Sequence, residues 1–122
     1  MKKILLAILI TVFVIFSMGS ISRRYNPVTA LAYYAVDTAS NDTYLAQIDG
    51  IGGYNAGLFV LLNPVTDNTG ACTLNINSLG AQSLKTVSGN DPADNHIDAS
   101  QIVPLCYDGS NFVIMSSDAN PP

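Results

Sequence analysis

From Tyr25 to its last residue, the chain contains almost none of the polar residues that favour an α-helix, namely Glu, Arg, Gln and Lys. Glu is absent from all 122 residues, and Lys85 is the only Lys or Arg after Arg24. Asn, Ser, Thr and Gly are abundant instead and favour turns, while the Val, Ile and Tyr among them favour strands. We therefore predict one all-β module over residues 25–116, followed by a frayed polar tail over residues 117–122.

The N-terminal residues 1–24 differ sharply from this module. Lys2 and Lys3 precede an apolar run, Ile4–Phe16, and small residues follow it up to Ser22. This layout is typical of a secretory signal peptide. The nineteen residues between Lys3 and Arg23 are also close to the ~20 residues that a bilayer-spanning helix needs. We expect one hydrophobic helix, either a cleaved signal, which is the favoured alternative, or a retained anchor through which the chain contacts the membrane.

Short runs of alternating apolar and polar residues predict the strands of the module. Regular spacing with turn signals between them is typical of a small antiparallel β-sandwich or a partly open barrel. Two hairpins are expected, one across residues 78–81 and one across Asp108-Gly109-Ser110. The predicted strands are residues 30–36, 43–48, 58–62, 72–77, 83–87, 102–107 and 112–115.

The alternation also predicts which side chains face the interior. The run Leu58–Leu62 is apolar on both faces, so it is expected to be a central, covered strand. Pro104 lacks an N–H, so its strand is expected at a sheet edge or with a bulge. The predicted core residues are Phe59, Leu61, Leu74, Ile76, Tyr107 and Phe112.

Three motifs occur in a fixed order between residues 54 and 112. They read Tyr-Asn-Ala-Gly-Leu at 54–58, Asn-Thr-Gly-Ala-Cys-Thr-Leu-Asn-Ile-Asn at 68–77 with Leu-Gly-Ala at 79–81, and Gln-Ile-Val at 101–103 with Tyr-Asp-Gly-Ser-Asn-Phe at 107–112. Together they resemble a module of bacteriophage tail fibres and related receptor-binding proteins, over about residues 33–115. The resemblance implies a β-sandwich in trimeric fibres beside a host-binding tip, without catalytic or cofactor residues.

This chain departs from the tail-fibre pattern in its export-type N-terminus, its two cysteines and Pro104. Tail fibres assemble in the cytoplasm and need no export. The N-terminal segment therefore favours a secreted or envelope-anchored version of the module, with the virion surface as the other location.

Two loops supply candidate ligand contacts. Tyr54 and Asn55 follow two glycines, and tyrosine rings can stack on sugars. The second loop, residues 88–100, contains Asp91, Asp94, His96 and Asp98. The last three would lie on one side of an extended segment, as metal ligands can, but their spacing matches no Ca²⁺-binding loop. A solvated polar loop is the favoured interpretation, and no metal is predicted.

Cys72 and Cys106 leave two alternatives open. In an exported protein they could form a disulfide that closes a long loop and contributes about 3–4 kcal/mol. They could instead be unpaired, small apolar residues of two core strands. The second alternative is slightly favoured.

The charge and composition exclude several functions. Residues 25–122 carry one Lys and nine Asp, a net charge of −8, which repels phosphate backbones and excludes a nucleic-acid partner. One His, no Glu and no Gly-x-Ser-x-Gly motif give no basis for an enzyme or a cofactor. We expect the chain to form a homo-oligomer, and the leading hypothesis for its function is an adhesive module for a cell-surface glycan or protein receptor.

The oligomer expected here is a homotrimer, as the resemblance implies. In such a trimer, several copies of a weak site would bind one multivalent receptor with avidity. Strands that are apolar on both faces also favour a partner surface. The alternatives are a monomer with a well-filled core and, for function, a membrane-anchored structural subunit of an envelope, virion or filament that has no ligand of its own.

Overall fold

The computed structural model describes residues 32–116, and all the regular structure in that range is β-strand. None of the described residues belongs to a helix long and apolar enough to cross a membrane. The predicted N-terminal helix, its cleavage site and the tail 117–122 lie outside the described residues. The strands are β1 (Tyr33–Val36), β2 (Thr43–Ala46), β3 (Phe59–Asn63), β4 (Thr73–Ile76), β5 (Gln82–Lys85), β6 (Val103–Tyr107) and β7 (Phe112–Ile114).

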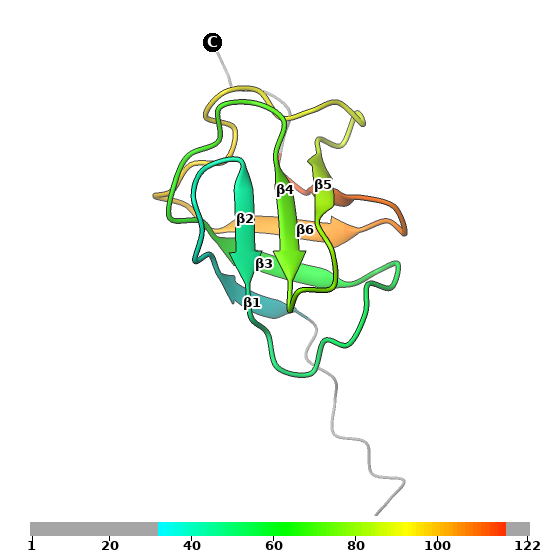
Figure 1. Ribbon diagram of the computed structural model, residues 1–122. Helices are drawn as coiled ribbons and strands as arrows, with labels where there is room; N and C mark the ends of the chain where they lie inside the picture. The colour runs from blue at the N-terminus through cyan, green and yellow to red at the C-terminus, as the bar shows by residue number, and fades with distance from the viewer. Residues whose placement is uncertain (1–31, 117–122) are drawn as a thin grey trace, which may run out of the picture. The chain divides into compact units, whose positions relative to one another are not determined.

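These strands form one sheet in the order β1-β3-β6-β7-β5-β4-β2, which curls into a nearly closed barrel. β2, β4 and β5 run across the direction of β1, β3 and β6 (Figure 1). The two end strands meet just beyond β1, where the Thr38 N–H donates a hydrogen bond to the Leu45 carbonyl at 2.9 Å. The prediction of an all-β module is confirmed. Of the two predicted architectures, a sandwich and a partly open barrel, the barrel describes the sheet.

The predicted antiparallel arrangement is wrong for half of the strand pairs. The two predicted hairpins, β4–β5 and β6–β7, are antiparallel as expected, and so is the pair β3–β6. However, β1–β3, β2–β4 and β5–β7 are parallel, and in each pair one strand of the chain intervenes between the partners. Side-chain alternation has the same period in both kinds of sheet, so the sequence pattern does not separate them.

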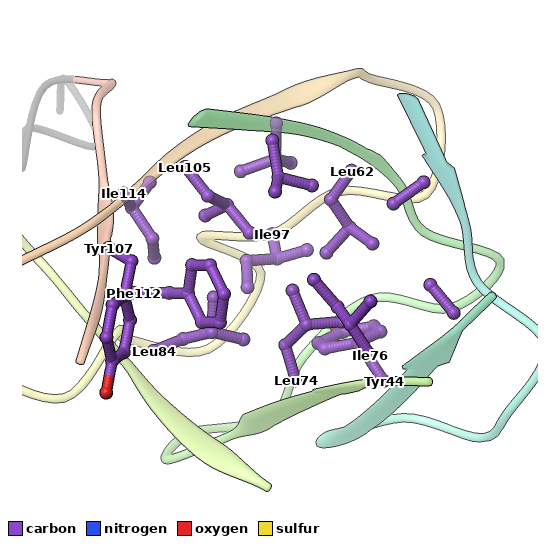
Figure 2. Packing of buried hydrophobic residues seen from close by; sticks show 14 of the residues in the cluster. Tyr44, Leu62, Leu74, Ile76, Leu84, Ile97, Leu105, Tyr107, Phe112 and Ile114 are labelled. Atoms are coloured by element: carbon purple, nitrogen blue, oxygen red, sulfur yellow. The ribbon is translucent and has the colours of Figure 1, made fainter. Parts of the chain in front are cut away.

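The barrel interior is filled from all its walls and from one loop. Figure 2 shows Leu62 and Leu105 on one side facing Leu74 and Ile76 on the other. Ile97, which lies in no strand, is fully buried among them. The predicted core residues Leu74, Ile76, Tyr107 and Phe112 are confirmed as buried.

Phe59 and Leu61 were predicted in the core, and this prediction is wrong by one residue. Val60 and Leu62 of β3 are fully buried, whereas Phe59 and Leu61 are half-buried on the outer side of the barrel. A shift of one residue exchanges the two faces of a strand. Because every residue from Leu58 to Leu62 is apolar, the alternation that fixes the other strands is missing here.

Pro104 lies in β6, which is an interior strand between β3 and β7 rather than a sheet edge. Its carbonyl accepts a hydrogen bond from the Met115 N–H at 2.8 Å, so the backbone of Pro104 faces the β7 side. β7 ends at Ile114, one residue before that contact. The N–H that Pro104 lacks would face the end of β7. Its absence there does not interrupt the ladder of hydrogen bonds between β6 and β7.

Candidate functional site

The loops gather at two ends of the barrel (Figure 1). At one end the Thr73 N–H donates to the Asp42 carbonyl, and the Asn68 N–H donates to the Ile97 carbonyl. We call this group of loops, residues 37–42, 64–72 and 86–102, the acidic loop end, because it holds six of the eight described Asp residues. The opposite end consists of residues 47–58, 77–81 and 108–111, joined by a hydrogen bond from the Gly57 N–H to the Tyr107 carbonyl.

The two predicted contact loops therefore lie at different ends of the barrel. Tyr54 and Asn55 belong to the opposite end, whereas Asp91, Asp94, His96 and Asp98 belong to the acidic loop end. The structure does not bring the two groups together. A single ligand site can include one group or the other, and the surroundings of each group differ.

At the opposite end, Tyr54 is fastened to the scaffold. Its hydroxyl donates to the Gly80 carbonyl at 2.9 Å and accepts from the Ile76 N–H at 2.8 Å. Its ring packs against Tyr107 and Phe112, with ring centroids 5.4 and 5.5 Å away. Burial raises the pKa of the Tyr54 phenol, which the Ile76 hydrogen bond opposes. Tyr54 therefore holds the β4–β5 turn, whereas Asn55 beside it is exposed.

At the acidic loop end, the fully buried Asn68 joins its own loop, residues 64–72, to the loop 86–102. Its amide group donates to the Gly70 carbonyl at 2.9 Å and to the Ala93 carbonyl at 2.8 Å. Its side-chain oxygen accepts from the Ile97 N–H at 2.7 Å. Since Ile97 is itself in the core, the loop that follows β5 is fixed from both sides. The sequence analysis assigned Asn68 only to a motif and missed this role.

Three carboxylates of the same end accept hydrogen bonds within or between the loops instead of projecting freely. Asp42 accepts hydrogen bonds from the backbone and the hydroxyl of Thr69, and these bonds hold the pKa of Asp42 below its ordinary value of 3.8. Asp98 accepts from the hydroxyl and backbone of Ser100, which likewise lowers its pKa. Asp67 accepts from the Ala99 N–H at 2.7 Å.

Asp91 and Asp94 are exposed, and His96 beside them is half-buried. Asp91 forms a surface ion pair with Lys85 at 2.6 Å, which leaves more than half of its side-chain surface exposed at 54%. A pair of this kind contributes little to stability. These side chains form the accessible part of a loop whose backbone is held in place by Asn68.

The disfavoured metal alternative placed Asp94, His96 and Asp98 on one side of an extended segment, and the structure does not have that arrangement. The segment turns at Asn95, whose φ of 57° is left-handed, and the His96 N–H donates to the Ala93 carbonyl. Such a turn removes the alternation that would place the three side chains on one side. Within residues 32–116, no three His, Cys, Asp or Glu side chains are grouped so as to hold a metal ion.

Both cysteines are free in the structure, which corresponds to the alternative in which they form no disulfide. Cys72 is in the core, as expected for that alternative, but Cys106 lies on the outer side of β6. Burial, followed by the nearby Asp42 and Asp91 carboxylates, raises the pKa of the Cys72 thiol to about 12. The raised pKa disfavours the thiolate of Cys72, which is the nucleophilic form of the side chain.

Asp37 is the second buried polar residue that sequence reasoning missed, and it closes the barrel. It is 2% exposed, and its carboxylate accepts from the N–H groups of Ala39, Leu45 and Val65 at 2.9, 3.0 and 3.3 Å. These donors belong to the turn after β1, to β2 and to the segment after β3. An Asp directly after a strand is a signal for a turn, but it does not indicate bonds to distant strands.

Raising the pH is expected to destabilise the protein. Burial raises the pKa of Tyr44, Tyr54 and Cys72 above their ordinary values of 10.0, 10.0 and 9.0. The folded chain thus keeps protons that the unfolded chain releases, so this stability is complete below about pH 9 and is lost as pH rises through the folded values. Urea unfolding at pH 8 and at increasing alkaline pH measures the effect, and an unchanged midpoint up to about pH 11 would contradict it.

No model of a known protein family matches the chain, and no curated protein matches it. The resemblance to tail-fibre modules therefore stays a prediction from the three motifs.

Proposed function

We propose that the chain is a non-enzymatic, tail-fibre-like binding module that contacts a cell-surface receptor through its acidic loop end. The observation that carries the proposal is the way in which these loops are fixed. Asn68, Asp42 and Asp67 join them by side-chain hydrogen bonds, while Asp91 and Asp94 stay exposed. A surface that is ordered before binding loses less conformational entropy when it binds.

The chemistry of this end favours a receptor that offers hydrogen-bond donors. The carboxylates of Asp91 and Asp94 accept hydrogen bonds from sugar hydroxyls or from the cationic groups of a protein. One His and no Glu in the chain support binding without catalysis. The three motifs support the same class of function, and the N-terminal residues 1–24 support export, with secretion or display at the cell envelope as the location.

A second candidate function is a structural subunit of an envelope, virion or filament, held by its N-terminal segment. The observation that favours it is the outer side of β3 and β6, where Phe59, Leu61 and Cys106 leave apolar surface unburied. A subunit needs such surface for packing but needs no receptor. The two functions differ in whether the purified chain binds any ligand.

A binding screen tests the proposal. Labelled full-length chain is applied to a glycan array and to a panel of bacterial cells, which the resemblance indicates as hosts. The proposal predicts a saturable signal on at least one glycan or cell type. Absence of saturable binding, with a native circular dichroism spectrum, would contradict it and would favour the structural subunit.

A further inference from the structure

The sequence contains two Asp-Gly pairs, Asp49-Gly50 and Asp108-Gly109, and both belong to loops at the opposite end of the barrel. An Asp that precedes a Gly can react with its own backbone without an enzyme. Glycine favours the reaction because it has no Cβ to shield its backbone nitrogen and because it adopts many backbone conformations. The two pairs are chemically identical, so any difference between them comes from the surrounding structure.

The reaction needs no other reactant than water. The backbone nitrogen of the glycine attacks the side-chain carboxyl carbon of the Asp, and a five-membered succinimide ring forms. The carboxyl OH and the amide proton leave together as one water molecule. A water molecule then opens the ring at one of its two carbonyl groups. One product is the original Asp, and the other is isoaspartate, in which the main chain runs through the former side-chain carboxyl.

Asp49 and Gly50 form the exposed tip of a turn. The turn is closed by a hydrogen bond from the Ile51 N–H to the Ile48 carbonyl at 3.5 Å. Gly50 has a φ of 88°, and no atom lies within 4 Å of the position that a Cβ would take there. Within residues 32–116, the Asp49 carboxylate has neither a hydrogen-bond donor nor a cation as partner. The carboxyl group is therefore free to approach the Gly50 nitrogen.

The two ends of this turn are fixed by one side chain of the β4–β5 turn. The Asn77 side-chain oxygen accepts from the Ile48 N–H at 2.7 Å. Its amide group donates to the carbonyls of Ile48 and Ile51 at 2.7 and 2.8 Å. These bonds leave out the peptide group between Asp49 and Gly50. Rotation of that peptide group, which the glycine permits, breaks none of the bonds that hold the turn.

The second pair is held in a different way. The Asp108 carboxylate accepts hydrogen bonds from the N–H groups of Ser110 and Asn111, both at 2.7 Å. The bonds from Asn111 and Ser110 hold the pKa of Asp108 below its ordinary value of 3.8, which disfavours the protonated carboxyl that loses water. A Cβ on Gly109 would lie 3.7 Å from the Cβ of Ala56, so this glycine is packed against a neighbouring loop.

We propose that residue 49 is a site of spontaneous isoaspartate formation and that the fold protects Asp108 from the same reaction. This goes beyond the proposed function, because it concerns a covalent modification away from the acidic loop end and involves no receptor. Isoaspartate adds one methylene group to the main chain between Ile48 and Ile51. Since Asn77 fixes both residues, the turn of an aged chain must change its shape.

Peptide mapping of aged protein tests the proposal. The full chain is kept folded for weeks at neutral pH and body temperature, in detergent if the N-terminal segment requires it. It is then unfolded and digested with a protease that cuts before Asp but not before isoaspartate. Isomerisation at residue 49 leaves an uncut fragment 42–66, and isomerisation at residue 108 leaves an uncut fragment 98–117. A sample digested before ageing corrects for incomplete cleavage.

Fragment 42–66 is expected to accumulate at least about 10-fold faster than fragment 98–117, because two hydrogen bonds to the Asp108 carboxylate must break first. The matched control is the same chain aged in urea, where both fragments are expected at similar rates. Equal rates in the folded chain, a folded chain that yields no fragment 42–66 while the urea sample does, or an equally large difference in urea would overturn the proposal.

Discussion

Truncation of Leu62 to alanine is expected to lower the free energy of unfolding by about 2–5 kcal/mol. Leu62 is fully buried in β3 and faces the centre of the barrel (Figure 2). The substitution removes apolar contacts and leaves a cavity that the strands on either side prevent from closing. Urea unfolding followed by circular dichroism measures the change.

Leu61→Ala is the matched control, because it makes the same chemical change one residue away. Leu61 is half-buried on the outer side, so its truncation is expected to cost clearly less than that of Leu62. Equal losses, or a larger loss for Leu61, would show that β3 has the opposite register. Both variants should be compared at the same protein concentration.

Substitution of Asp37 by alanine is expected to cost about 3 kcal/mol or more, because each of its three N–H partners that is left unsatisfied costs about 1–3 kcal/mol. Three N–H donors from separate segments lose their acceptor, and one of them, Leu45, lies where the end strands meet. Thermal or urea unfolding measures the loss. A cost under about 1 kcal/mol would mean that the barrel does not depend on this closure.

Two further variants test whether the cost comes from the closure of the barrel by Asp37 or from the loss of a carboxylate in general. Asp37→Asn keeps an oxygen for Ala39 and Leu45 but places an NH₂ group opposite the Val65 N–H, so it is expected to lose less than Asp37→Ala. Asp67→Ala removes an exposed carboxylate with one backbone bond and is expected to have a much smaller effect.

Much of the fold could be predicted from local pattern. The alternation of Leu74 and Ile76 with polar neighbours identified a half-buried strand, and Asp108-Gly109 identified a hairpin, where Gly109 has a φ of 104°. The pairing of distant strands could not be predicted in this way. β1–β3 and β2–β4 are parallel neighbours that are separated in the chain by one strand, and no local period records the direction of a partner strand.

The candidate site was predicted less completely than the fold. Exposed Asp91 and Asp94 are where the loop prediction placed them. The residues that shape the loop, Asn68 and the buried Ile97, have roles that depend on chain segments more than twenty residues away. A buried Asn in a Gly-rich motif and an exposed Asn in a turn look alike in a single sequence. Tyr54 was likewise identified as a contact by its loop position, while its hydroxyl hydrogen bonds point inward.

The most direct test of the account compares the two ends of the barrel in a binding titration with a glycan or cell surface that captures the wild type. The double variant Asp91→Ala and Asp94→Ala is expected to raise the dissociation constant at least about 10-fold, about 1.4 kcal/mol. Asn55→Ala, exposed at the opposite end, is expected to bind as the wild type does. Unchanged binding by the double variant together with loss for Asn55→Ala would contradict the claim that the acidic loop end contacts the receptor.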